Sequence, residues 1–282
     1  MMNILTFDIE EWFHLLDNDS TRSEIQWGRY EKRIEGNVGR ILDILDSTGS
    51  KATFFIVGWI AKQYPQVVRR ISENYQVGSH TMNHQLVWQQ TPAEFRKDVD
   101  ESVKRLEDIT GQQIECFRAP GFSIRESEAW AFETLAEYGI KYDSSVFPAH
   151  HAHGGMPSYS ISRPGIITHH GVSLKEFPIP FKRIAGHHII FSGGGYFRLF
   201  PYHFIRMWTH EAGYNLCYIH PRDLDSAQPM IKELSLFRRF KSYYGLQHAE
   251  HKFRKLLTEF DFTDIKSADN TIDWNQATQF KI

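Results

Sequence analysis

The sequence predicts an α/β fold built on a parallel sheet. Apolar runs of strand length alternate with amphipathic helical patterns along most of the chain, and this alternation is typical of βαβ units. Polar motifs follow directly after several of the apolar runs. Because the catalytic residues of a parallel barrel gather at the carboxyl ends of its strands, the motif positions indicate a barrel with one site at its mouth.

The elements are expected in alternation from the N-terminus. The first strand begins almost at once and leads to Asp8, and the first helix carries an apolar stripe that stops near Gly49. Strands are expected at 3–7, 52–57, 114–117 and 216–219, with short ones before His80 and Asp143. Further helices are expected at 65–75, 92–111, 126–138 and 201–212.

The clearest helix start is the segment Thr91-Pro92-Ala93-Glu94. A threonine followed three residues later by glutamate forms a capping box, and proline suits the first helical position. The apolar stripe that follows faces inward and ends near Gly111, a residue suited to the left-handed conformation that closes a helix.

The pattern changes after about residue 147. Residues 147–192 are rich in histidine, glycine and proline and are expected to form loops and short β segments over the site. The sequence predicts a barrel domain over residues 1–225 and an extension over 226–282, which holds a basic, aromatic stretch and a helix near Phe253. We expect the extension to pack on the barrel, with covering the site, docking a partner or touching a membrane as alternatives.

The composition excludes several classes of protein. A chain of 282 residues with a formal net charge of -2 gives no reason to expect a nucleic-acid partner, and it has no polybasic run for an anionic membrane. No apolar stretch approaches the ~20 residues of a transmembrane helix. Without a secretory signal pattern, a cytoplasmic location is expected. Cys116 and Cys217 lie in apolar runs and are expected to be reduced, buried thiols.

Two carboxylates and two histidines carry the metal prediction. Asp8 and Glu10 are two residues apart on a strand and point the same way. His80 and His84 are four apart, which places them on one face of a helical turn. Two imidazoles and one carboxylate leave coordination positions open for water and substrate. An H-x-x-x-H spacing is weak evidence alone in a chain with 15 histidines, but an acidic first strand strengthens it.

Two more motif residues have roles in proton transfer as hypotheses. Arg118 precedes a rigid Ala-Pro-Gly turn and could orient a catalytic carboxylate, with a surface salt bridge as the alternative. His220 ends an apolar strand and could be a general acid, with a bond to a backbone carbonyl as the alternative. The histidines at 150–153, 169–170 and 187–188 are expected to be solvated loop residues, and a second metal site is the alternative reading.

Taken together, five motifs resemble the polysaccharide deacetylase family, also called carbohydrate esterase family four or the NodB-homology domain. They lie at 6–10, 80–84, 118–121, 142–145 and 216–220. The resemblance runs from Asn3 to about Asp225 and implies a distorted TIM-like (β/α)7 barrel with a short C-terminal helical extension. The segments at 10–13, 194–198, 218–221 and 244–246 resemble the subgroup associated with exopolysaccharide and exosortase loci.

This resemblance implies a hydrolase that removes N-acetyl groups from an amino sugar in a polysaccharide or its lipid- or nucleotide-linked precursor. One divalent metal, zinc first and Co²⁺, Ni²⁺, Fe²⁺ or Mn²⁺ as alternatives, would be held by Glu10, His80 and His84. Asp8, oriented by Arg118, would be the base. The expected proton donor is His220, and the residues expected at the substrate are Trp12, Phe13, His14, Asp143 and Tyr196.

Two departures from the family pattern leave alternatives open. Ile9 stands where the commonest first motif has a second aspartate, so the metal carboxylate would be Glu10. This form also resembles members that hydrolyse cyclic amides and imides, and a barrel that binds carbohydrate without turnover is a third hypothesis. The fourth motif lacks its usual tryptophan, which leaves the role of Asp143 open. Trp12, Phe13, His14 and Tyr196 could instead pack the barrel mouth.

Overall fold

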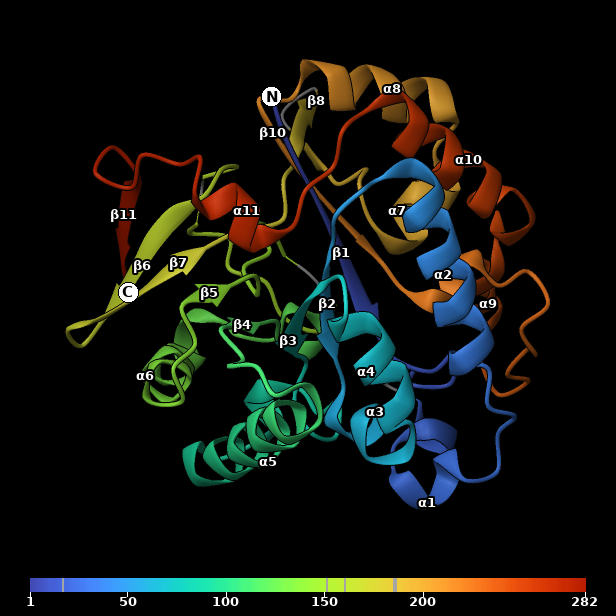
Figure 1. The fold of residues 1–282 in the computed structure, drawn as a ribbon, viewed down its shortest axis with the longest axis horizontal. Coiled ribbons are helices and arrows are strands. Elements are labelled where there is room, and N and C mark those ends of the chain that lie inside the picture. The colour runs from blue at the N-terminus through green and yellow to red at the C-terminus, as the bar shows by residue number, and fades with distance from the viewer. Residues whose placement is uncertain (17, 151, 160, 185–186) are drawn as a thin grey trace.

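A nine-stranded sheet forms the centre of the molecule (Figure 1). The computed structural model describes residues 1–16, 18–150, 152–159, 161–184 and 187–282. The strand order is β10-β1-β2-β3-β4-β5-β7-β6-β11. The bounds are β1 Met2–Ile9, β2 Thr53–Ile56, β3 Gln76–Ser79, β4 Cys116–Phe117, β5 Tyr142–Asp143, β6 Gly165–His169, β7 Val172–Glu176, β10 Tyr214–Ile219 and β11 Thr278–Lys281. A separate hairpin pairs β8, Lys182–Ile184, with β9, His187–Ile189.

Within the described residues of the nine-stranded sheet, the seven neighbouring strands from β10 to β7 run parallel, and only the β6–β7 pair is antiparallel. The register aligns their carboxyl ends, since Phe7 pairs with both Ile219 and Phe54 and Phe117 pairs with Asp143. The polar residue that follows each strand therefore reaches the same edge of the sheet. This arrangement confirms the predicted α/β fold class.

Helices cover the outside of the sheet, as α2 to α6 do around β1 to β5 in Figure 1. Their bounds are α1 Glu24–Trp27, α2 Ile34–Thr48, α3 Gly58–Gln63, α4 Pro65–Ser72, α5 Pro92–Thr110, α6 Trp130–Glu137, α7 Gly194–Leu199, α8 Tyr202–Glu211, α9 Leu236–Tyr243, α10 Leu246–Glu259 and α11 Ile265–Asp269. The predicted capping box is present, because Thr91 and Glu94 bond each other's backbone N–H groups. Gly49 and Gly111 close α2 and α5 with φ of 65° and 66°.

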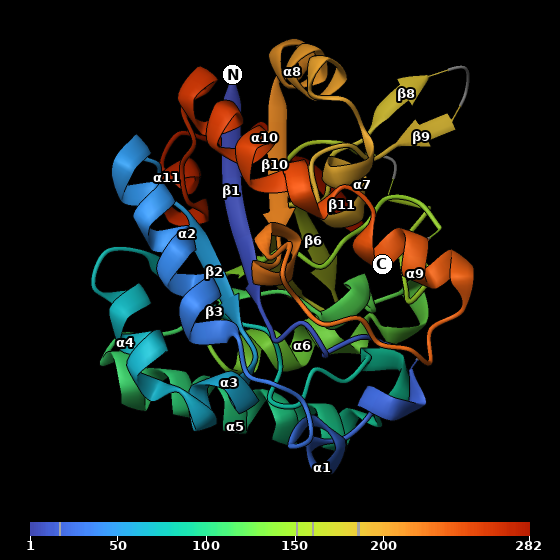
Figure 2. The same cartoon turned by 90° about the vertical axis from the view of Figure 1, so that its right-hand side faces the viewer.

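The C-terminal segment is part of the core around β1. Helix α10 lies in front of β1 and β10 in Figure 2, and the Phe253 ring contacts Phe7 edge-on at 5.9 Å. The carbonyl of Thr263 accepts the N–H of Leu5 at 2.9 Å, and Thr53 Oγ1 accepts the N–H of Ile265 at 2.9 Å. Residues 246–265 thus cover strands that the N-terminal part of the chain leaves open. The division at residue 225 stays a prediction.

The structure shows the state of the two cysteines and the length of the apolar helices. Cys116 and Cys217 are buried free thiols, as predicted. Burial raises the pKa of the Cys217 thiol to about 12, so it stays protonated at neutral pH. Among the described residues, no helix is both long and apolar enough to cross a bilayer.

Shortening Phe253 to alanine should destabilise the protein strongly. The ring is fully buried against β1, so its removal leaves a cavity, and we expect a loss of about 3–5 kcal/mol in the free energy of unfolding. Phe204→Ala removes an equal side chain that is 42% exposed on α8 and serves as the matched control, expected to cost under about 1 kcal/mol. Urea unfolding followed by circular dichroism measures both. Equal losses would show that α10 does not stabilise the barrel.

Candidate active site

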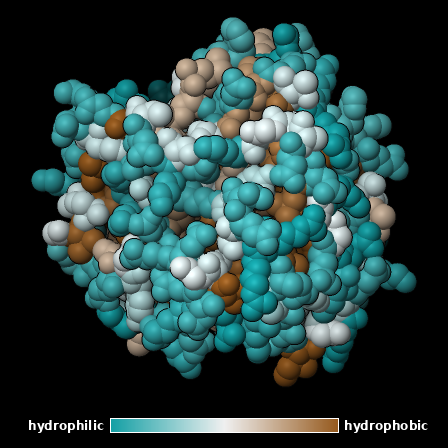
Figure 3. Space-filling view, in the orientation of Figure 1, coloured by the Kyte–Doolittle hydropathy of each residue, from teal (hydrophilic) through white to brown (hydrophobic). Residues whose placement is uncertain are grey.

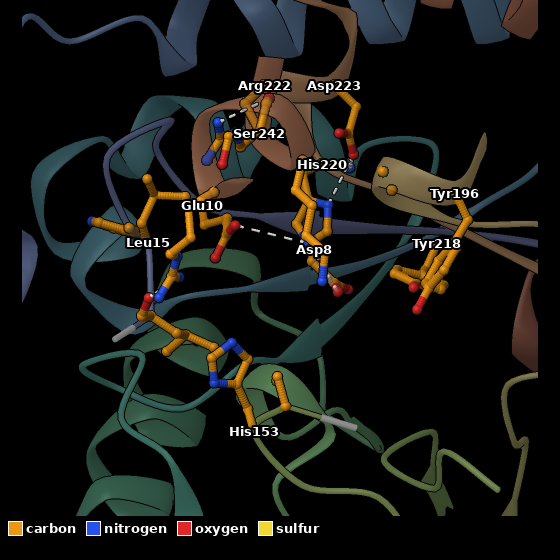
Figure 4. Close-up of a pocket in the computed structure, with 18 of the residues that line it drawn as sticks. Asp8, Glu10, Leu15, His153, Tyr196, Tyr218, His220, Arg222, Asp223 and Ser242 are labelled. Carbon is orange, nitrogen blue, oxygen red and sulfur yellow. Dashed lines mark hydrogen bonds and ion pairs between the residues drawn. The ribbon is translucent and has the colours of Figure 1, made fainter. Parts of the chain in front are cut away.

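A cavity of about 520 Å³ opens at the carboxyl edge of the parallel strands. Figure 4 shows Asp8 and Glu10 entering it from the end of β1, with His220 from the end of β10 close by. His14, His80 and His84 also line it. The first strand, the loop after β3 and the end of β10 therefore meet at one place, although His220 stands 212 positions after Asp8 in the sequence.

Glu10, His80 and His84 form a compact group of potential metal ligands. One ligand atom from each lies within 4.8 Å of the others, and all three residues are buried. Glu10 Oε2 lies 2.6 Å from His84 Nε2. Two imidazole nitrogens and a carboxylate oxygen are the donor set of a catalytic zinc site, in which further positions stay open. The residues that the sequence singled out for a metal are thus brought together.

The environment prepares these donors for a cation. The Nδ1 of His80 lies 2.7 Å from the carbonyl oxygen of Arg118. A carbonyl only accepts, so Nδ1 carries the proton and the Nε2 lone pair is left for a metal. Burial lowers the pKa of His80 to about 4, which keeps the ring neutral. Burial opposes ionisation of Glu10, but the adjacent His84 outweighs it and lowers the carboxyl pKa to about 2.

The loop that carries the two histidines differs from the sequence prediction. His80 directly follows β3, and His84 lies in an irregular loop rather than on a helical turn. Thr81 and His84 have φ of 64° and 53°, a region that costs most residues about 1–3 kcal/mol. The buried Asp98 carboxylate on α5 holds the loop by accepting the N–H groups of Met82, at 2.7 Å, and Asn83, at 3.3 Å. The orientation of the His84 side chain therefore depends on this left-handed backbone conformation and not on helical spacing.

Asp8 is held by a fully buried guanidinium. Arg118 Nη1 donates to Asp8 Oδ1 at 2.7 Å and to Thr6 Oγ1 at 2.8 Å. Its Nε and Nη2 donate to the carbonyl and hydroxyl oxygens of Ser144 at 3.1 and 2.8 Å. The guanidinium also lies over the Phe55 ring at 4.3 Å. The ion pair expected between Arg118 and a catalytic carboxylate is therefore present, and it leaves Asp8 Oδ2 facing the cavity.

His220 stands opposite, paired with an aspartate that the sequence reasoning did not identify. Its Nδ1 donates to Asp223 Oδ2 at 2.9 Å, and Arg198 Nε donates to the other oxygen at 2.9 Å. Burial alone would lower the pKa of His220, but the bond to Asp223 and the nearby Glu10 and Asp8 raise it to about 9. His220 Nε2 lies 3.8 Å from both Asp8 Oδ2 and Glu10 Oε1. The H-x-x-D spacing after the strand was the available signal for Asp223.

A layer of buried carboxyl groups lies behind Arg118. Asp143 is fully buried and accepts the N–H and O–H of Ser145 at 3.0 and 2.7 Å. It pairs across the sheet with Glu176, and burial together with Asp143 raises the pKa of Glu176 well above its usual range. A proton retained on Glu176 supplies the donor between the two carboxyl groups. Asp143 does not line the cavity, and its role in substrate binding stays a prediction.

The four aromatic residues predicted near the substrate divide into two pairs. His14 and Tyr196 line the cavity. Trp12 and Phe13 are buried: Trp12 Nε1 donates to the Glu31 carbonyl at 2.9 Å, and Phe13 stacks on a neighbouring tyrosine. Their contacts favour the alternative of packing the barrel mouth. For all four residues, substrate binding stays a prediction.

The other histidine groups have different surroundings. His169 and His170 share one oxygen of Glu133, at 3.3 and 3.0 Å, and 73% of the His170 side chain is exposed. Glu133 and His169 are partly buried, and His169 belongs to strand β6, so only His170 of this second group is a solvated loop residue. Their contacts are those of ordinary ion pairs or hydrogen bonds. His153 lines the cavity (Figure 4), whereas His151 lies outside the described residues.

Comparison with known proteins places two family models along the chain. Residues 5–142 match the model described as polysaccharide deacetylase, and residues 144–270 match a domain of unknown function, DUF3473. A peptidoglycan-N-acetylglucosamine deacetylase of Bacillus cereus is 32% identical over 96 residues, which cover 33% of this chain and 35% of that protein. A chitooligosaccharide deacetylase of Sinorhizobium fredii is 32% identical over 132 residues, covering 45% of this chain and 54% of that protein. The chain thus spans less than two thirds of the length of these relatives.

Solved structures share the fold at low sequence identity. A Mycobacterium smegmatis protein superposes with a TM-score of 0.64 and 18% identity over 100% of this chain and 93% of its own. A family 4 carbohydrate esterase of Streptomyces lividans, in complex with acetate, gives 0.51 and 13% over 93% of this chain and 91% of its own. A Bacillus anthracis protein described as a family 4 pseudoenzyme gives 0.52 and 14% over 94% and 64%. The fold alone therefore does not decide activity.

These matches agree with the predicted distorted barrel, and the two family models meet near residue 143. The polysaccharide deacetylase match contains Asp8, Glu10, His80, His84 and Arg118, and the second match contains His220. The cavity is thus lined by residues from both matched segments. The N-terminal half of the chain is a polysaccharide deacetylase domain, from a family of carbon–nitrogen hydrolases, and it is followed by a DUF3473 domain.

Proposed function

We propose that the chain is a metal-dependent hydrolase that removes N-acetyl groups from an amino sugar in a polysaccharide or its precursor. The observation that carries the proposal is the arrangement around one cavity. A three-residue donor group, Glu10, His80 and His84, lies between a carboxylate held by Arg118 and a histidine held by Asp223. Hydrolysis of an amide needs these parts: a cation binding site, a base and an acid.

Glu10, His80 and His84 would hold the metal, with zinc as the first choice and Co²⁺, Ni²⁺, Fe²⁺ or Mn²⁺ as alternatives. A divalent ion supplies Lewis acidity, which polarises a carbonyl group and makes water a stronger acid. The buried carbonyl of Arg118 keeps His80 in the tautomer that such an ion requires. The ionised Glu10 balances part of the positive charge.

Asp8 is the proposed base. Its Oδ1 is occupied by the bond to Arg118, which fixes the orientation of the carboxylate. Its Oδ2 faces the cavity and can take a proton from the attacking water. This charge-assisted hydrogen bond holds the carboxylate in place before substrate arrives.

His220 is the proposed acid. Asp223 accepts the Nδ1 proton and stabilises the charged ring, so Nε2 carries a proton into the cavity. The 3.8 Å separations from Asp8 and Glu10 place acid and base on the same small space. The proton on Nε2 can pass to the nitrogen of the departing amine as the C–N bond breaks, and acetate leaves with the oxygen of the water.

The names of the relatives support an N-acetylated amino sugar as the substrate class, since one acts on peptidoglycan N-acetylglucosamine and another on chitooligosaccharides. The proposal includes a cytoplasmic location, where the substrate would be a nucleotide- or lipid-linked precursor. Hydrolysis of a cyclic amide or imide is a second candidate, favoured by Ile9 between the two carboxylates of the first motif. Acetate release from N-acetylated saccharides, against ring opening of hydantoin-like compounds, distinguishes the two candidates.

Replacing the proposed base should slow turnover strongly while the metal site keeps its ion. Asp8→Asn keeps the shape and the contact with Arg118 but removes the proton acceptor, so we expect acetate release to fall by about 10²–10⁴-fold. Asp19→Asn, on the exposed surface, is the matched control and should leave the rate unchanged. Turnover by Asp8→Asn near that of the unaltered protein would refute the assignment of the base.

Metal content should depend on His84. After chelation and repletion, elemental analysis of the unaltered protein should find one tightly bound divalent ion per chain, because three buried donors converge there. We expect His84→Ala to lose most of it. His169→Ala, which removes a histidine from the second donor group, should retain the full content. An unaltered protein that binds no ion under any repletion would leave carbohydrate binding without turnover as the better hypothesis.

A further inference from the structure

Helix α9 presents its apolar side chains to solvent. Leu236 is 82% exposed, Phe237 66% and Phe240 50%, and none of its residues is buried. Every other helix of eight or more residues in the described parts of the chain buries at least three side chains. At 3.6 residues per turn, these three side chains fall within an arc of about 100°. They therefore form one apolar stripe and not scattered exposed residues.

The stripe is flanked by positive charge. Arg238, Arg239 and Lys241 lie on the same helix, and residues 234–246 contain no aspartate or glutamate. Lys241 Nζ lies 4.6 Å from the centre of the Phe237 ring, so cation and apolar surface are adjacent. An exposed apolar stripe with basic neighbours is the pattern of a helix that lies in the headgroup layer of a membrane. In contrast, the face of the molecule in Figure 3 is mostly hydrophilic, with apolar residues in small groups.

The helix is held firmly although its apolar side chains are not packed. Arg198 donates to the carbonyl oxygens of Lys241, at 2.9 Å, and Tyr244, at 2.7 Å. Arg222 donates to the carbonyl of Ser242 at 3.4 Å, as the dashed line in Figure 4 marks. These bonds anchor the backbone of α9 at its C-terminal end. The exposure of the stripe is thus a property of a fixed helix.

This helix stands at the mouth of the catalytic cavity. Phe237, Phe240 and Tyr244 line the cavity, and the partly exposed Tyr196 and Leu199 of α7 lie on the same rim. Leu236 does not line it. A surface that takes up the stripe would therefore also cover the entrance through which substrate reaches Asp8.

We propose that α9 docks on an anionic phospholipid surface. Leu236, Phe237 and Phe240 would enter the boundary between headgroups and acyl chains, while the exposed Lys241, beside the Phe237 ring, contacts lipid phosphates. Arg238 and Arg239 are half-buried and donate to the carbonyls of Leu16 and Lys232, so they add positive charge near the stripe without pointing from it. Charge disfavours a second copy of this chain as the occupant, because two such faces would bring the basic residues of both copies of the helix together. Stacking on a sugar does not account for Leu236, which is aliphatic and lies outside the cavity. Docking would place the mouth of the cavity next to saccharides that are carried at the membrane.

Vesicle sedimentation tests the proposal with the full chain and without any substrate. The unaltered protein is expected to sediment with vesicles of phosphatidylcholine and phosphatidylglycerol, and less with phosphatidylcholine alone or in high salt. Leu236→Asp should weaken binding by roughly tenfold or more, since it places a carboxylate in the stripe. Ile25→Asp is the matched control: Ile25 is 80% exposed on α1 and lines no part of the catalytic cavity, so binding should not change.

The readouts separate this proposal from the proposed function. Leu236→Asp and the milder Leu236→Gln should keep the unfolding temperature and the turnover of a soluble substrate, because the side chain touches neither core nor cavity. No sedimentation of the unaltered protein, or equal sedimentation of Leu236→Asp and Ile25→Asp, would overturn the docking proposal and leave the hydrolase untouched. A fall in oligomer mass by light scattering for Leu236→Asp would instead assign the stripe to a second copy and also overturn it.

Discussion

The buried guanidinium of Arg118 is the interaction on which the site depends. It has no exposed surface, and its donors reach β1 at Thr6 and Asp8 and the end of β5 at Ser144. Its own backbone continues β4: its N–H donates to the Ser79 carbonyl, and its carbonyl accepts from His80. One residue therefore holds Asp8, the proposed base, fixes the tautomer of His80, a proposed metal ligand, and ties the central strands together. A buried charge of this kind tolerates no loss of its partners, because an unpaired ion in the interior costs several kcal/mol.

Two histidines that line this cavity differ in their preferred charge because their surroundings differ. His80 donates to a neutral carbonyl and is kept uncharged by burial, which suits a ligand. His220 donates to an ionised carboxylate that is itself held by Arg198, which favours the charged ring. In the proposed mechanism, the charge of one acceptor atom thus separates a metal ligand from a proton donor that lines the same cavity.

Much of this arrangement could be predicted from the sequence, for local reasons. The cap residues at Thr91, Gly49 and Gly111 located helix ends, since these signals depend on near neighbours. Asp8 and Glu10 both line the cavity, but Glu10 lies just beyond β1 and its N–H donates to the Asp8 carbonyl, so a local turn and not strand alternation places it. The aim of His84 could not be predicted, because it rests on positive φ angles stabilised by Asp98 from another helix. Arg198 could not be predicted either, because it reaches Asp223 from α7, whereas Asp223 lies three residues after His220 and its H-x-x-D spacing is a local signal. Exposure of α9 also depends on what the rest of the fold leaves uncovered.

The pairing of β1 has a consequence for how the protein is made. β1 pairs with β10, where Met2 faces Tyr214, and its Leu5 N–H is accepted by Thr263. At a synthesis rate of roughly 5–20 residues per second, these partners leave the ribosome about 10–50 s after β1. During that interval the edge of β1 that pairs with β10 has no partner, and pairing between segments so distant in the sequence forms slowly. The first motif of the site is thus the earliest part to be synthesised and among the last to be completed, and a chaperone that shields the nascent strand would act at this stage.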